Sequence, residues 1–233
     1  LTALGSYGDV HPMVGLGVTL TRRGHRVSVV ANPYFADVVR GAGLELLSIG
    51  TTEEYLELAG DPRLWHPLGG MSLLLRRAVV DLLPQLYKLI DANHLPGETV
   101  VAAHPLDAAS RVFREVQGAK VATVVYAPMA LASTHAAPAL GLPTFGPGMP
   151  RWVNALQLAV GNRLLLGPLL KRPLNEFRKQ RGLAPIARLM PDWWYRSDLT
   201  LGLFPDWFSP PQADWPRPLA AVGFPLWDGG EGV

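Results

Sequence analysis

The segment GSYGDVHP, residues 5–12, carries the side chains of this chain that are best suited to chemistry. It follows a short apolar run at residues 1–4, which is typical of a buried parallel strand. Asp9 and His11 could each accept a proton, and a helix terminus here favours an anion. In the alternative interpretation, Asp9 only caps a helix that begins at Pro12, and His11 lies in solvent. Spacing alone leaves both interpretations open.

A second group of polar side chains follows the predicted strand at residues 99–104. Ligands of an open parallel sheet bind outside the carboxyl ends of its strands. We therefore expect His104 and Asp107 to face the same cleft as residues 5–12. They could equally cap the end of the strand, with Pro105 beginning a helix.

The elements that must position these groups follow a regular alternation. The first fifty residues read as strand, helix, strand, helix and strand with short connections, which predicts an α/β fold. We expect a Rossmann-like, doubly wound, mostly parallel sheet of seven strands with helices on both faces. The predicted strands are residues 1–4, 26–31, 44–49, 99–104, 120–126, 199–204 and 219–222. The predicted helices begin at Pro12 and cover 34–40, 52–59, 72–93 with a kink at Pro84, 107–117, and 151–181 with breaks at Gly161 and Gly167-Pro168.

Composition excludes several classes of protein. The 233 residues are 48% apolar and 17% charged, which suits a folded core and not a disordered chain. The 21 Lys and Arg nearly balance 19 Asp and Glu and form no basic run, so we expect no nucleic-acid partner. There is no cysteine, which removes disulfides and thiolate chemistry and suits a reducing compartment; we expect the cytoplasm.

The sequence predicts neither a bound dinucleotide nor a metal. GSYGDV matches neither the G-x-G-x-x-G fingerprint nor the phosphate-binding loop with its Lys, and Asp9 places a negative charge where a pyrophosphate needs a donor. No pair of His or acidic residues has metal-ligand spacing. A nucleotide-dependent oxidoreductase with a degenerate glycine loop stays as an alternative, which bound dinucleotide would reveal by its absorbance.

Longer stretches of the sequence are similar to a known family. Residues 5–12 fit G-S-x-G-D-V-x-P and, after an apolar helix, residues 23–27 fit R-G-H-x-V. This pattern resembles the amino-terminal domain of GT-B glycosyltransferases, in the group of sterol, glycopeptide-antibiotic, macrolide and rhamnolipid-type transferases. Later segments are similar in the same order: VVAAHPLDAASRVFREVQGAKVATVVYAP, LNEFRKQRGLAPI, LGLFPDWFSPPQADWP and VGFPLWD.

The resemblance implies a domain organisation. Residues 1–223 would form the acceptor-binding amino-terminal domain, and residues 224–233 would begin the linker to a carboxy-terminal, donor-binding domain that this chain lacks. The reaction would be inverting transfer of a hexose from a UDP- or dTDP-sugar to an acceptor hydroxyl, with no cofactor and no metal. The alternative is a non-catalytic acceptor-binding subunit that needs a separate donor-binding chain.

The resemblance also implies roles for single residues. Related families have a His where this loop has Asp9, so Asp9 is the candidate general base, with His11 as the second candidate. We expect Gly5, Ser6, Tyr7 and Gly8 to help hold the sugar-phosphate of the donor. The family often has Arg at the position of Tyr7, so a charge contact there is in doubt. His104 is expected to contact the acceptor or to orient the base.

The acceptor is expected to be lipophilic, such as a sterol, lipid or polyketide. Long loops on a rigid sheet carry specificity, and those of this chain are apolar and aromatic. The residues expected to bind the acceptor are His104, Met129, His135, Trp65 and Phe145. Ordinary core packing is the alternative for the aromatic and Met side chains. The apolar stretch 156–170 could lie on a membrane surface, but its few charges favour a groove or the core.

Overall fold

The strands form parallel pairs on either side of the amino-terminal segment. In the computed structural model, which describes residues 1–66, 69–135, 149–227 and 229, β1 (Ser28–Ala31) pairs with β2 (Glu45–Ser48). The other strands pair in chain order: β3 (Val100–Ala103), β4 (Lys120–Val125), β5 (Leu199–Gly202) and β6 (Leu219–Ala221). Each of these pairs is parallel, as the sequence predicts.

Residues 1–4 join the two groups of strands. Thr2 bridges Val30 of β1, and the N–H of Thr2 donates to the carbonyl of Ala102 in β3 at 2.9 Å. The spatial order is therefore β2, β1, residues 1–4, β3, β4, β5 and β6. The predicted strand at 1–4 forms only one bridge, so the described residues hold six strands and not the seven predicted. The strand order reverses between residues 1–4 and β3, which is where a doubly wound sheet binds its ligand.

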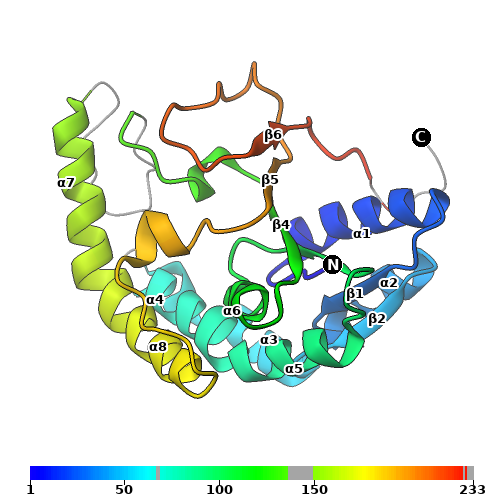
Figure 1. Ribbon diagram of the computed structural model, residues 1–233. Coiled ribbons are helices and arrows are strands. Elements are labelled where there is room, and N and C mark those ends of the chain that lie inside the picture. The colour runs from blue at the N-terminus through cyan, green and yellow to red at the C-terminus, as the bar shows by residue number, and fades with distance from the viewer. Residues whose placement is uncertain (67–68, 136–148, 228, 230–233) are drawn as a thin grey trace.

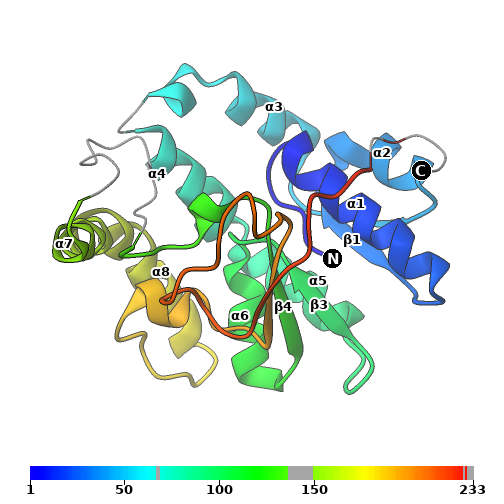
Figure 2. The same cartoon turned by 90° about the horizontal axis from the view of Figure 1, so that it is seen from above.

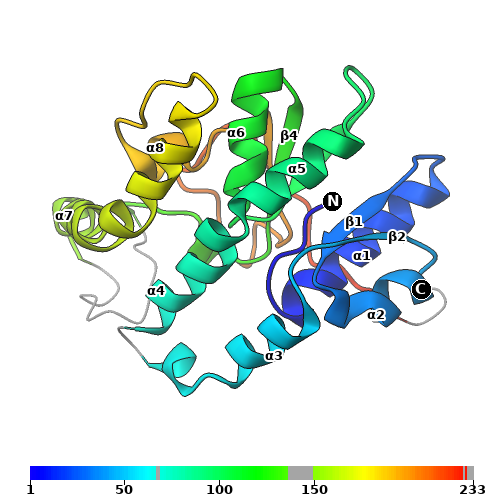
Figure 3. The same ribbon diagram turned by 90° about the horizontal axis from the view of Figure 1, so that it is seen from below.

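Helices cover both faces of the sheet, and each face has its own apolar core (Figures 1, 2 and 3). Side chains of α1 (Tyr7–Arg22) and α2 (Ala36–Gly41) pack in one core. Side chains of α5 (Leu83–Asn93) and α6 (Ala108–Gln117) pack in the other. Neighbouring residues of one strand divide between the two cores, because successive side chains of a strand point to opposite faces.

The remaining helices are peripheral or continue one another. The 3₁₀ segments are η1 (Pro33–Phe35), η2 (Pro62–Trp65) and η4 (Pro128–Ala130). The further helices are α3 (Thr52–Gly60), α4 (Gly70–Leu75), α7 (Arg151–Gly161) and α8 (Arg172–Lys179). The π-helical segments are η3 (Arg76–Asp81) and η5 (Asn162–Lys171). The segment η6 (Leu189–Trp193) is a short helical turn that is interrupted at Met190, whose φ of −106° and ψ of 141° are not helical.

The first helix begins earlier than predicted. Ser6 is the N-cap of α1, so Asp9 is the third residue of the helix and Pro12 lies inside it. The prediction that the helix starts at Pro12 is therefore wrong. The physical reason is that Ser6 and Asp9 form a capping box, which starts the helix one and a half turns before the proline.

The two long helical stretches, residues 70–93 and 151–179, continue past their proline and glycine residues through π-helical segments. Residues 70–93 run through α4, η3 and α5, and the π-helical turn η3 ends just before Pro84, where a kink was predicted. In the same way α7 continues through η5, which contains Gly167 and Pro168, into α8. Because Pro has no N–H to donate four residues back, the local hydrogen-bond pattern must change.

Candidate active site

The carboxylate of Asp9 folds back onto the turn that starts α1. The N–H of Ser6 donates to Asp9 Oδ2 at 2.7 Å, and the Ser6 hydroxyl donates to the same oxygen at 3.2 Å. Gly5 has a φ of +139°, and a Cβ at that position would lie 2.2 Å from Asp9 Oδ2. Glycine at position 5 is therefore required both by the backbone and by the space that the carboxylate occupies.

The same carboxylate pairs with His104 across the switch point of the sheet. Nε2 of His104 lies 3.1 Å from Asp9 Oδ1, although the two residues are 95 positions apart in the sequence. The N–H of Leu106 donates to His104 Nδ1 at 3.1 Å. Nδ1 is thus an acceptor, and in the neutral ring the proton lies on Nε2, which donates to Asp9.

A buried network holds His104 in place. The N–H of His104 donates to the Thr2 hydroxyl at 2.9 Å, and that hydroxyl donates to Asp107 Oδ2 at 2.8 Å. Asp107 is also the N-cap of α6, where its Oδ1 accepts from the N–H of Ser110 at 2.8 Å. The network therefore fixes the end of β3 against residues 1–4 and against the start of α6.

The pair differs in exposure and in charge. The side chain of His104 is 5% exposed and that of Asp9 is 27% exposed, so only Asp9 is accessible to a ligand of moderate size. Burial would raise the pKa of Asp9, but the hydrogen bonds from His104 and Ser6 outweigh it and hold that pKa below its ordinary value.

His11 does not join the pair. Its ring packs edge-on against Tyr7 at 5.3 Å and against Trp227 at 5.5 Å between centroids. No hydrogen bond connects His11 with Asp9 in the described part of the chain. Position 11 thus serves to pack the chain end near Trp227 onto α1.

Of the residues predicted to hold a sugar-phosphate, Tyr7 and Gly8 begin α1, Ser6 is its N-cap, and Gly5 comes before the cap. The N–H and the hydroxyl of Ser6 both donate hydrogen bonds to the carboxylate of Asp9. Gly8 is open on its outer side, since a Cβ there would meet only the Ser6 hydroxyl at 3.6 Å. Tyr7 is half exposed and packs edge-on against Phe35.

The predicted acceptor residues are dispersed. Met129 lies in η4, four residues beyond the end of β4, and Trp65 lies in η2; both side chains are exposed. His135 is exposed, and its N–H donates to the Ser133 hydroxyl. Phe145 lies outside the described residues. No contact in the described ranges joins Trp65, Met129 or His135 to the Asp9–His104 pair, so their roles stay predictions.

Two residues beside the pair escaped the sequence analysis. Thr2 was treated only as part of an apolar strand, and Tyr126 only as the end of one. The ring of Tyr126 lies 5.4 Å from that of His104, and its buried hydroxyl has no hydrogen-bond partner among the described residues. The sequence could have indicated them by their hydroxyl groups: Thr2 lies within the apolar run 1–4, and Tyr126 ends the predicted strand 120–126.

Two further features of the described residues bear on the site. No cluster of three or more His, Asp or Glu side chains in them could hold a metal ion. None of their helices is both long and apolar enough to cross a bilayer.

Comparison with curated proteins finds glycosyltransferases. O-mycaminosyltylonolide 6-deoxyallosyltransferase of Streptomyces fradiae is 29% identical over an alignment of 264 residues, covering 98% of this chain and 54% of the relative. A sterol 3-beta-glucosyltransferase of Yarrowia lipolytica is 39% identical over 62 residues, covering 27% of this chain and 4% of the relative. This chain therefore spans at most about half the length of these relatives. No protein-family model matches it.

Solved structures with this fold are also glycosyltransferases. The calicheamicin glycosyltransferase CalG4 superposes with a TM-score of 0.57 at 21% identity, over 95% of this chain and 51% of that one. The glycosyltransferase VinC, solved in complex with dTDP, superposes with a TM-score of 0.55 at 17% identity, over 95% of this chain and 51% of that one. At such identities the likeness concerns the fold.

Proposed function

This chain is a relative of GT-B glycosyltransferases, as its sequence motifs predict, and we propose that it forms their acceptor-binding, amino-terminal domain. The proposed reaction is inverting transfer of a hexose from a UDP- or dTDP-sugar to a hydroxyl of a lipophilic acceptor. One observation carries the proposal: the carboxylate of Asp9, partly open to solvent, is held by His104 where the strand order reverses.

The hydrogen bonds of Asp9 leave room for a proton. A carboxylate offers about four lone pairs. Oδ2 accepts two bonds from Ser6, whereas Oδ1 accepts only the bond from His104 in the described chain. As the acceptor oxygen bonds to the anomeric carbon, its proton would pass to Oδ1. The bond from the anomeric carbon to the diphosphate would break, and the nucleoside diphosphate would leave with that electron pair.

His104 is proposed as a positioning residue and not as the base. Its Nδ1 already accepts the N–H of Leu106, so a second proton on the ring would break that bond. Its Nε2–H donates to Oδ1 of Asp9, which orients the carboxylate and stabilises its ionised form. This assignment refines the sequence prediction that His104 either contacts the acceptor or orients a base.

The proposed classes of donor and acceptor are supported by the names of the relatives and by the first turn of α1. VinC was solved with dTDP, and the curated relatives are named for a macrolide-type and a sterol acceptor. Within α1, the backbone N–H groups of Tyr7 and Gly8 lie in the first turn, where no partner within the helix exists. We propose that they contact the donor from this side, while a second domain holds most of the nucleotide.

Replacing the carboxylate tests the proposal directly. Asp9→Asn in the full-length protein should lower kcat by about 10²–10⁴-fold, because the amide cannot take the proton. Turnover would be followed by mass spectrometry with UDP- and dTDP-sugars and a panel of hydrophobic alcohols. The matched control is Glu54→Gln, which alters the same kind of capping box in α3, where Glu54 accepts from the N–H of Thr51 at 2.9 Å. Equal turnover in Asp9→Asn and wild type would refute the assignment of the base.

The pH profile separates Asp9 from a histidine base. Because the pKa of Asp9 lies below its ordinary value, kcat/KM should stay level from neutral pH to about pH 5. Activity should fall only at lower pH, as the carboxylate becomes protonated. His104→Ala removes a bond that lowers this pKa, so the acidic limb should move to higher pH. A limb near pH ~6.5 in the wild type would instead indicate a histidine base.

An acceptor-binding subunit that works with a separate donor-binding chain is the second candidate. The purified natural protein distinguishes the two: turnover by one polypeptide supports the two-domain enzyme, and turnover only after a second chain is added supports the subunit.

A further inference from the structure

The helix α7 turns an apolar face to the outside. The exposed fractions are 69% for Trp152, 57% for Leu156, 45% for Val160 and 70% for Leu164, which continues the series in η5. These residues are four positions apart, so they form one stripe along the helix. Ala155 and Ala159 are exposed between them. An exposed row of apolar side chains of this kind is typical of a surface that binds another protein, a membrane or a ligand.

The inner side of α7 is more polar than the outer side. Asn154 is buried, and its side-chain amide donates to the carbonyl of Thr134 at 2.9 Å. Gln157 also faces inward, and its buried Nε2 has no hydrogen-bond partner in the described part of the chain. A helix between core and water has the opposite pattern. The composition of α7 therefore fits an apolar medium on its outer side.

The sequence on both sides of the stripe is basic. From Val116 to Asn175 the sequence has no Asp or Glu, and it has five basic residues: Lys120, Arg151, Arg163, Lys171 and Arg172. Arg151 and Arg163 are exposed near the two ends of the stripe, and neither forms an ion pair with a described residue. In all three views α7 lies at the rim of the molecule (Figures 1, 2 and 3).

We propose that this face, Trp152, Leu156, Val160 and Leu164 with Arg151 and Arg163, docks on the surface of an anionic lipid bilayer. The apolar side chains would enter the boundary between headgroups and acyl chains, and the two arginines would meet lipid phosphates. A second copy of the chain fits less well, because a two-fold contact through α7 would bring like charges together. The proposal is independent of the proposed sugar transfer.

The structure divides the stretch 156–170: Leu166, Leu169 and Leu170 pack with the core, as the sequence favoured, whereas the stripe is exposed. The sequence favoured a groove or the core because a helix on a membrane normally has a charged face. In the structure that criterion does not apply, since the other side of α7 packs on the protein and not against water. The exposed stripe is neither a groove nor the core.

Binding to vesicles tests the proposal without any turnover. The full-length protein should float with vesicles of phosphatidylcholine and phosphatidylglycerol, and less with phosphatidylcholine alone or in high salt. The double variant Leu156→Ser/Leu164→Ser should lose about tenfold or more in partitioning. The charge variant Arg151→Glu/Arg163→Glu should lose the preference for phosphatidylglycerol. The matched control, Leu56→Ser/Leu95→Ser, replaces leucines that are about half exposed elsewhere and should bind as the wild type does.

Three outcomes would overturn the proposal. The first is a wild-type protein that does not bind the anionic vesicles. The second is binding that the substitutions in α7 leave unchanged. The third is a wild-type dimer that the same substitutions dissociate in sedimentation equilibrium without lipid, which would assign the face to a contact between copies. Circular dichroism of each variant confirms that α7 remains folded.

Discussion

The hydroxyl of Tyr126 is the least satisfied polar group beside the Asp9–His104 pair. It is buried, and no described residue forms a hydrogen bond with it. Burial first, and then the charge of Asp9, raise the pKa of Tyr126 well above its ordinary value, so the phenol stays protonated. A buried group without a partner costs about 1–3 kcal/mol. Its place next to the pair suggests that a bound acceptor completes the hydrogen bond.

Tyr126→Phe should therefore keep or raise the free energy of unfolding, while it raises the KM for the acceptor by about tenfold. The matched control is Tyr195→Phe. The hydroxyl of Tyr195 accepts from the N–H of Ala132 at 2.7 Å and donates to the carbonyl of Ala130 at 3.0 Å. That variant should lose about 1–2 kcal/mol in urea unfolding. Loss of stability in Tyr126→Phe would mean that its hydroxyl has a structural partner.

At the scale of residues, the sequence indicated the members of the site but not their bonds. Asp9 and His104 were both expected near the carboxyl ends of strands, because parallel topology brings those ends together. Which nitrogen of His104 meets which oxygen depends on the capping box at Ser6 and on the turn at Leu106. The spacing of residues in the sequence does not predict which side-chain atoms form a hydrogen bond.

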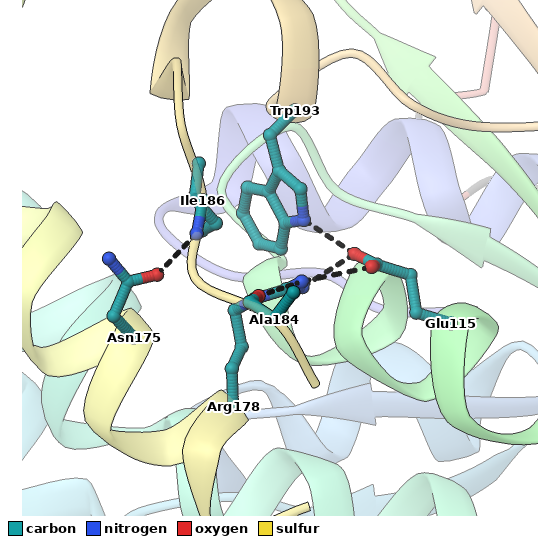
Figure 4. Close-up of polar contacts among 6 residues, drawn as sticks. All are labelled: Glu115, Asn175, Arg178, Ala184, Ile186 and Trp193. Atoms are coloured by element: carbon teal, nitrogen blue, oxygen red, sulfur yellow. Dashed lines mark hydrogen bonds and ion pairs between the residues drawn. The ribbon is translucent and has the colours of Figure 1, made fainter. Parts of the chain in front are cut away.

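Among the elements, α6, α8 and η6 are held together by one carboxylate. Glu115 of α6 accepts from Arg178 of α8 at 2.6 Å and from the indole N–H of Trp193 in η6 at 2.5 Å (Figure 4). The side chain of Arg178 is only 5% exposed. Burial would raise the pKa of Glu115, but the bonds from Arg178 and Trp193 outweigh it and lower that pKa.

Glu115→Ala should lower the free energy of unfolding by about 3 kcal/mol, because it leaves the buried charge of Arg178 unpaired. The matched control is Glu176→Ala, which removes an exposed ion pair to Arg172 and should cost less than about 0.5 kcal/mol. The lowered pKa adds a pH dependence. The stabilisation is present above the ordinary pKa of Glu and is lost as the pH falls through the lower folded value. Urea unfolding at pH 7 and at acidic pH measures both effects; equal losses in the two variants would contradict the argument.

The sequence identified most elements but not their ends. It predicted a helix over residues 52–59, and in the structure Thr51 caps that helix, α3, in a capping box with Glu54 three residues later. The same pattern at Ser6 and Asp9 was overlooked, because Pro12 gave a competing start signal. The π-helical turns of η3 and η5 could not be predicted, since they depend on how neighbouring turns pack.

For the whole molecule, residues 1–4 are the connection between the two groups of strands, and Thr2 is its polar centre. Its backbone pairs with β1 and β3, and its hydroxyl links the N–H of His104 to the carboxylate of Asp107. The doubly wound order was predictable from the alternation of strands and helices. This link was not, because a single Thr in an apolar run looks like any other strand residue.

Thr2→Val tests that link, because it keeps the shape of the side chain and removes both hydrogen bonds. It should lower the free energy of unfolding by about 1–3 kcal/mol, since a buried N–H and a buried carboxylate lose their partner. It should also lower kcat, because the N–H of His104 would lose the hydroxyl that holds His104 next to Asp9. Thr123→Val is the matched control: Thr123 is equally buried in β4, but its hydroxyl bonds to no residue that the structure describes. That change should leave stability unchanged or raise it. If urea unfolding gave the same loss for both variants, the cost would come from packing alone, and Thr2 would not be the polar link between the two groups of strands.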